Sequence, residues 1–201
     1  MNKFRILLTV VLFGVTGHLQ ASMEDIIASC NDCHGPDGVS QHSDVPTIAG
    51  YSEATIYDMM FAFVDQTRKE ISSKYRHGDT SRPEKSMVAI AKELTEEQIE
   101  ALAVHYSQLE FVPAKQEFDA ALVSAGEKLH EKQCQKCHED GGSSPDDDAG
   151  ILAGQWSDYL RQVFTHYRND ERASEEEMIK KVKELSDQQI DSLIAYYASM
   201  Q

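Results

Sequence analysis

CNDCH at residues 30–34 and CQKCH at residues 134–138 are the two stretches that decide how this chain is organised. Both have the pattern C-x-x-C-H, and together they use all 4 cysteines of the 201-residue sequence. This pattern indicates attachment of c-type haem, because two thiols about one helical turn apart can form thioethers with the two vinyl groups of one haem. The histidine that follows would lie under the ring and bind the iron. We therefore predict two covalently bound haems c. The residues that would attach them are Cys30, Cys33, Cys134 and Cys137, and the proximal iron ligands would be His34 and His138.

Three other uses of the cysteines fit this pattern less well. A thioredoxin-like redox pair is expected in a βαβ context and does not need a histidine after each pair. A zinc site could use the thiols, but it would leave both histidines idle. Disulfides between residues three apart would be strained and would stabilise little.

The two motifs belong to an internal repeat. The second follows the first by 104 residues, and the same offset aligns Ile48-Ala49-Gly50 with Leu152-Ala153-Gly154. Further on, KELTEEQI at 92–99 matches KELSDQQI at 183–190 with an offset of 91. The first half therefore has about 13 extra residues, which we assign to the polar stretch 68–82. A duplication of this kind predicts two domains. We expect a signal peptide at 1–21 and domains at 22–110 and 111–201.

The sequence between the motifs favours helices. Apolar side chains recur at helical spacing from Ile99 and from Ile190, each time after a capping-box pattern that starts at Thr95 or Ser186. No long alternating strand pattern is present, so the fold class is all-α. Further helices are expected over 24–29, 52–65, 119–131 and 157–168.

Methionine is the usual sixth ligand of an electron-transferring c-type haem, and the repeat selects two candidates. Met87 and Met178 each lie seven residues before the leucine of the K-E-L motif. We predict that they are the distal iron ligands. Met59 and Met60 have no methionine at the equivalent positions of the second half and are better explained by packing. His77 and His166 are rival ligands, but neither is repeated.

Charge and the first residues indicate where the protein is found. Residues 1–21 contain Lys3 and Arg5, an apolar run and small residues before a cut after Ala21, as in a secretory signal peptide.

Lys plus Arg number 19 and Asp plus Glu number 34, which gives a net charge of −15 that becomes −17 after cleavage. Such an acidic chain is not expected to bind nucleic acid, because phosphate binding depends on Lys and Arg. No stable membrane span is expected after cleavage.

The paired C-x-x-C-H motifs, the [IL]-A-G steps and the Met before K-E-L-[ST] resemble the two-domain dihaem cytochromes of the cytochrome c4 type. The resemblance implies two tandem class I cytochrome c-like domains, His/Met ligation and a periplasmic location. In the second half, the sequences at 113–119, 126–130 and 151–156 also resemble the cytochrome subunit of flavocytochrome c sulfide dehydrogenase. That narrower likeness implies a non-catalytic electron-transfer subunit whose partner is a flavoprotein. The alternative is a free cytochrome c4-like carrier that works with other redox proteins and delivers electrons to a terminal oxidase.

An enzymatic role is a less favoured hypothesis. A dihaem peroxidase would need one haem with an open position and acid–base groups above it. Both halves offer a methionine at the same place, which argues for closed coordination. The acidic runs 146–148 and 175–177 could steer a basic partner to the second haem, or could be solvated loops.

Overall fold

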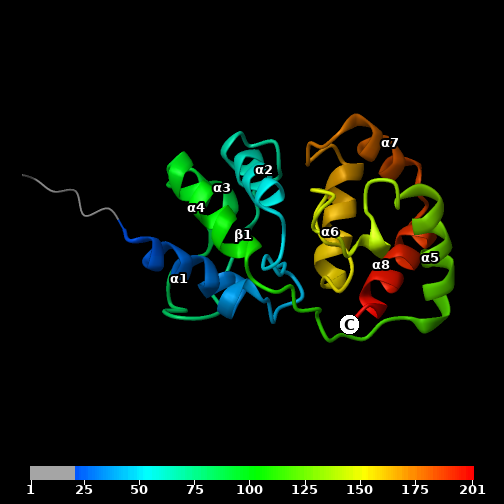
Figure 1. Ribbon diagram of the computed structural model, residues 1–201, viewed down its shortest axis with the longest axis horizontal. Helices are drawn as coiled ribbons and strands as arrows, with labels where there is room; N and C mark the ends of the chain where they lie inside the picture. Colours follow the sequence, from blue (N-terminus) through cyan, green and yellow to red (C-terminus); the bar gives the residue numbers. More distant parts are fainter. Residues whose placement is uncertain (1–20) are drawn as a thin grey trace, which may run out of the picture.

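The computed structural model describes residues 21–201 and shows two helical units side by side (Figure 1). The first unit contains α1 (Met23–His34), α2 (Glu53–Val64), α3 (Met87–Ala91) and α4 (Glu96–Ser107), with a 3-10 turn, η1 (Pro36–Gly38), and two short paired strands, β1 (Ser72–Ser73) and β2 (Lys85–Ser86). The second unit contains α5 (Ala120–Gln133), η2 (Asp140–Gly142), α6 (Ser157–Arg168), α7 (Glu176–Glu184) and α8 (Asp187–Ser199). The predicted all-α, two-domain fold is confirmed. The expected signal peptide, apart from its last residue, lies outside the described residues.

Both capping boxes predicted from the sequence are present. The Thr95 hydroxyl accepts a hydrogen bond from the Gln98 backbone N–H, and the Gln98 side chain accepts one from the Thr95 N–H. Ser186 and Gln189 do the same at the start of α8. The helices α3 and α7 were not expected. They begin close to Met87 and Met178, so both predicted distal ligands are held by helices.

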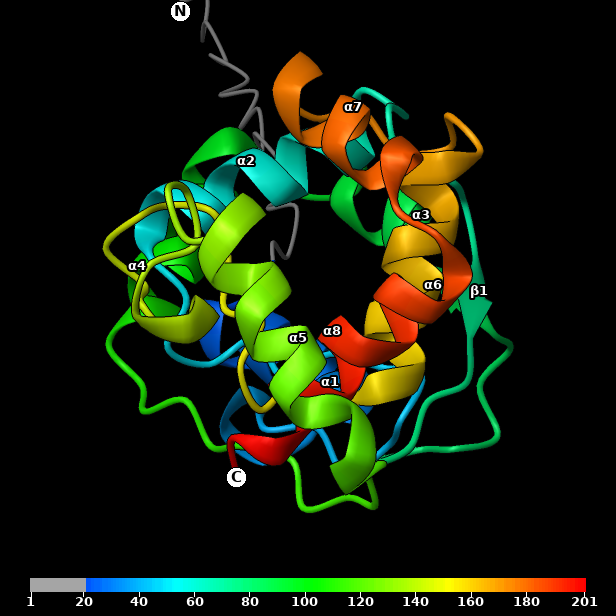
Figure 2. The ribbon, with the colours of Figure 1, turned by 90° about the vertical axis from the view of Figure 1, so that its right-hand side faces the viewer.

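Each unit has its own apolar core, built from equivalent positions. Tyr106 on α4 and Tyr197 on α8 are each only 1% exposed and lie 91 residues apart, the offset of the second part of the repeat. In the second unit α5 crosses close to α8 (Figure 2), because Gly126 has no side chain there. A Cβ at Gly126 would lie 2.0 Å from the Ser192 carbonyl oxygen.

The two units meet through equivalent backbone segments, 67–69 and 171–173. Arg68 and Arg172, which are 104 residues apart, form an isolated antiparallel bridge. Backbone hydrogen bonds of 2.7 and 2.8 Å flank it, one from each direction. The contact therefore has approximate two-fold symmetry, like the interface of a symmetric dimer.

Side chains repeat this symmetry deeper in the interface. The Tyr51 hydroxyl donates to the Ile151 carbonyl at 3.2 Å, and Gln155 Nε2 donates to the Thr47 carbonyl at 2.6 Å. Tyr51 and Gln155 are equivalent positions at the 104-residue offset, as are Thr47 and Ile151. Gln155 is fully buried, and its Oε1 also accepts a hydrogen bond from the Thr47 N–H. Three hydrogen bonds between buried polar groups thus cross the interface.

The bridge corrects the placement of the extra residues. Arg68 and Lys69 pair with the second unit at the 104-residue offset, so they belong to the repeat and not to the insertion predicted at 68–82. The insertion starts at Glu70 and ends before Met87. Residues 70–86 occupy the place that 174–177 hold in the second unit.

Candidate functional site

The first C-x-x-C-H motif forms the last turn of α1. Cys33 and His34 are 8% and 7% exposed, so both face the interior of the unit. The helix ends because Gly35 adopts φ +84°, where a Cβ would lie 2.1 Å from the Val39 carbonyl oxygen. Nδ1 of His34 donates to the Pro46 carbonyl at 2.9 Å. This hydrogen bond fixes the ring and leaves Nε2 free to bind iron.

The second motif follows α5 in tight turns. The His138 N–H donates to the Cys134 carbonyl at 3.0 Å, and the His138 side chain is 7% exposed. Its Nδ1 is buried and has no hydrogen-bond partner. Gly150 stands at the position that Pro46 holds in the first unit. The two histidines therefore differ in the contact that would tune the basicity of the ligand.

Cys30, Cys33 and Cys134 do not have the properties of redox-active cysteines. Burial raises the pKa of Cys30 to about 11, and burial also raises the pKa of Cys33 and of Cys134. Catalytic dithiols need lowered pKa values, because the thiolate is the nucleophile. Within residues 21–201, no three His, Cys, Asp or Glu side chains converge as they would around a zinc ion. The thioredoxin and zinc alternatives therefore gain no support.

Each predicted distal methionine packs on the same core as the first cysteine of the motif in its unit. Met87 is half-buried at the start of α3 and packs on the core that Cys30 also contacts. Met178 is half-buried on α7 and packs on the core that Cys134 contacts. Met60 is a buried member of the first core, which agrees with the packing interpretation.

The rival histidines lie in other surroundings. His77 lies in the insertion, where its backbone N–H donates to the Asp32 carbonyl at 2.9 Å. His166 is half-buried near the end of α6. His130 is 1% exposed, and its Nδ1 lies 3.0 Å from the Tyr197 hydroxyl.

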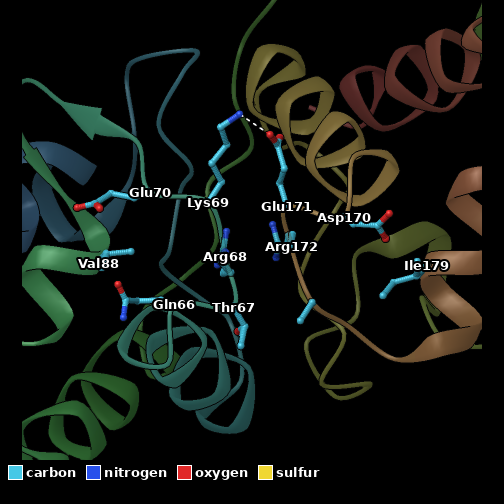
Figure 3. A pocket seen from close by; sticks show the side chains of 11 residues that line it. Gln66, Thr67, Arg68, Lys69, Glu70, Val88, Asp170, Glu171, Arg172 and Ile179 are labelled. Atoms are coloured by element: carbon cyan, nitrogen blue, oxygen red, sulfur yellow. Dashed lines mark hydrogen bonds and ion pairs between the residues drawn. The ribbon is translucent and has the colours of Figure 1, made fainter.

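A cavity of about 590 Å³ lies where the two units meet (Figure 3). Val88 and Ile179, the residues that follow the two predicted distal methionines, line it from opposite sides. Arg68 and Arg172 face it without any carboxylate partner among the described residues, and Nη1 of the buried Arg172 has no partner at all. Burial, and then the nearby Arg172 charge, lower the pKa of Arg68. Buried cations need anions. A haem c brings two carboxylates to its site, so these residues fit the group that the motifs predict.

Sequence reasoning missed the interface residues. Gln155 and Arg172 have no motif of their own, and their role depends on contacts across more than 100 residues of sequence. The only feature of the sequence that indicates a shared role for Arg68 and Arg172 is that they occupy equivalent positions in the repeat.

Comparison with known families identifies both halves of the chain. A family model described as cytochrome c matches residues 24–109, and one described as cytochrome c oxidase, cbb3-type, subunit III, matches residues 121–196. The chain thus consists of two tandem cytochrome c domains. With one C-x-x-C-H motif in each, they imply two covalent haems c.

Relatives of similar length match both domains together. Cytochrome c4 from Stutzerimonas stutzeri is 27% identical over 98% of this chain and 98% of its own length. A thiosulfate dehydrogenase electron acceptor from Thiomonas intermedia is 28% identical over 74% of this chain and 66% of its own length. The crystal structure of reduced cytochrome c4 from Pseudomonas stutzeri has the same fold, with a TM-score of 0.70 over 89% of this chain and 97% of that one, at 21% identity.

These findings support the cytochrome c4 part of the resemblance over its narrower part. No cytochrome subunit of flavocytochrome c sulfide dehydrogenase is among these relatives. The similarity that suggested such a subunit was confined to short stretches of the second half. None of the helices between residues 21 and 201 combines the length and the apolar character of a membrane-spanning segment.

Proposed function

We propose that this chain, a dihaem cytochrome of the cytochrome c4 family, is a periplasmic carrier that passes electrons between redox proteins. The symmetric contact between the two units is the observation that most strongly supports this proposal. Buried side-chain hydrogen bonds and a backbone bridge join the two units, so electrons would move between haems at a constant separation. We propose residues 22–110 and 111–201 as the two domains.

The residues of each site have defined roles in this proposal. Cys30 and Cys33 form the thioethers of the first haem, and Cys134 and Cys137 those of the second. His34 and Met87 are the iron ligands in the first domain, and His138 and Met178 those in the second. The haem iron supplies the one-electron redox chemistry. The protein keeps water from the ligands by burying both histidines, and the Pro46 carbonyl holds the ring of His34 in place.

The donor and the acceptor are proposed from the relatives. The Thiomonas intermedia relative is an electron acceptor of thiosulfate dehydrogenase, so a periplasmic sulfur-compound dehydrogenase is a candidate donor. A terminal oxidase is the candidate acceptor. A flavoprotein donor is the second candidate, because the stretches 113–119, 126–130 and 151–156 favour it.

Three measurements test the proposal. The reduced pyridine adduct of the denatured protein should report two haems c per chain, and a value of one would exclude a dihaem carrier. The fully reduced holoprotein should not bind carbon monoxide rapidly, because both haems have closed His/Met coordination. Rapid binding would contradict the assignment of Met87 or Met178. Copurification with a flavoprotein would favour the subunit role over the free carrier.

A further inference from the structure

The insertion 70–86, here called the cover, folds back over the first C-x-x-C-H motif. The backbone N–H groups of Arg76 and His77 donate to the Asp32 carbonyl at 2.7 and 2.9 Å. The Cys33 thiol lies 3.7 Å from the Lys74 carbonyl oxygen. Asp32 and Cys33 belong to the motif itself, so the cover lies directly on the edge where the first haem would be attached.

Side chains hold the cover in place. Arg82 forms an ion pair with the Asp32 carboxylate and stacks on the buried Tyr75 ring, with 3.6 Å between the guanidinium carbon and the ring centroid. Gly78 adopts φ +61° against the same carboxylate, where a Cβ would lie 2.5 Å from an Asp32 oxygen. Asp32 is thus contacted by a charge, two amides and a glycine of the cover.

The second motif has no such cover. Four residues, 174–177, replace the seventeen of the cover. Gln135, Lys136 and Cys137 are all exposed, whereas Cys33 is buried. The two sites therefore differ at the edge from which a partner protein could approach.

The surroundings of the two edges also differ in charge. Residues 131–148, which contain the second motif, include six acidic and two basic side chains. The cover contains three acidic and four basic side chains. The acidic residues at the open edge favour a partner with a basic face, because complementary charge speeds encounter.

We propose that the cover closes the first haem edge to partner proteins and that the open, acidic edge of the second domain is the surface where a basic redox protein docks. This inference rests on the proposed electron-carrier function and assigns its partner site. Electrons of the first haem would then reach a partner through the second haem. The rate of electron transfer between proteins falls steeply with distance. A segment such as the cover, which lies over one haem edge, therefore decides which haem exchanges electrons directly with a partner protein.

The closure is tested on the ferric holoprotein with hexaamminechromium(III), a redox-inert paramagnetic cation. Its addition should broaden the NMR signals of the haem methyl groups of the second domain and leave those of the first domain sharp. Arg82→Gln should make the first-domain signals broaden too. Arg161→Gln is the matched control, because it removes the same charge from an exposed pair of the second unit and should leave the first-domain signals sharp. Equal broadening of the methyl signals of both haems in the unaltered protein would overturn the proposal.

Hydrogen exchange gives a second measure of the same closure. The amides of Arg76 and His77 should exchange about tenfold faster in Arg82→Gln, since the ion pair and the stacked ring both hold the cover down. Unchanged exchange together with unchanged broadening would show that Arg82 does not hold the cover and would contradict the mechanism.

The docking surface is tested with a basic monohaem cytochrome c as the electron donor, in stopped-flow experiments at low ionic strength. Asp146→Asn/Asp148→Asn should lower the bimolecular rate by about threefold, and added salt should remove the difference. Asp147 is left intact because its carboxylate accepts hydrogen bonds from two backbone N–H groups. The control is the double variant Asp58→Asn/Glu100→Gln, which removes two negative charges from exposed residues of the first unit. Equal loss in both double variants would refute docking at the second domain. A protein without two redox-active haems would instead refute the proposed function.

Discussion

Replacement of Gln155 by alanine should loosen the contact between the two domains. Gln155 is fully buried and its side chain makes three hydrogen bonds across the interface. Two of them join the Thr47 backbone N–H and carbonyl, and the third joins the Tyr51 hydroxyl. Alanine removes all three and leaves the Thr47 groups, in a residue that is 1% exposed, without partners.

The expected loss follows from these contacts. Three hydrogen bonds at about 1 kcal/mol each give about 3 kcal/mol, and the unpaired backbone groups of Thr47 raise the loss toward about 5 kcal/mol. For a chain of this size that unfolds as a unit, a loss of about 3 kcal/mol lowers Tm by about 6–12 °C.

Calorimetry of the ferric holoprotein measures this change. Gln188→Ala is the matched control, because that residue is exposed on α8 and its side chain makes no hydrogen bond in the described structure. The control should melt within about 2 °C of the unaltered protein, as surface substitutions do. If Gln155→Ala melts at the same temperature as Gln188→Ala, the buried polar contacts do not hold the domains together and the argument for a constant haem separation fails.

Three further changes test separate parts of the structure. Met178→Leu should remove about half of the weak near-infrared band of ferric His/Met haem, since each of two haems contributes; a band of full strength would refute this ligand. Ser186→Ala should cost about 1 kcal/mol and lower Tm by about 2–4 °C, because α8 loses its N-cap; an unchanged melting curve would show that the capping box adds no stability. Burial lowers the pKa of His130, so below about pH 6.5 the unfolded chain binds a proton that the folded chain does not, and stability falls with falling pH. Urea titrations between pH 5 and 8 measure the free energy of unfolding. This free energy should depend less steeply on pH in His130→Gln than in the unaltered protein, and an equal slope would contradict the lowered pKa of His130.

Much of the architecture could be predicted from local patterns. The C-x-x-C-H motifs, the two capping boxes and the helical spacing after Thr95 and Ser186 depend on residues a few positions apart. Chemistry at such short range is readable in a single sequence. The repeat then supplied the domain number without any long-range contact.

Two helices and the limits of the insertion could not be predicted in this way. The predicted distal methionines lie at the start of α3 and on α7, whose short length leaves little periodicity to detect. The polar neighbours of Arg68 in the sequence place it in the predicted insertion. Only its backbone bridge to Arg172 shows that it belongs to the repeat.

The number of domains, their helical nature and the two haems could all be inferred from spacing along the chain. Tertiary structure alone decided how the two sites differ. His34 meets the Pro46 carbonyl, while Nδ1 of His138 meets no partner. Cys33 lies beneath the cover, while Cys137 is exposed. These differences arise from contacts between segments that are distant in sequence, and burial and hydrogen bonding are properties of those contacts and not of the motif.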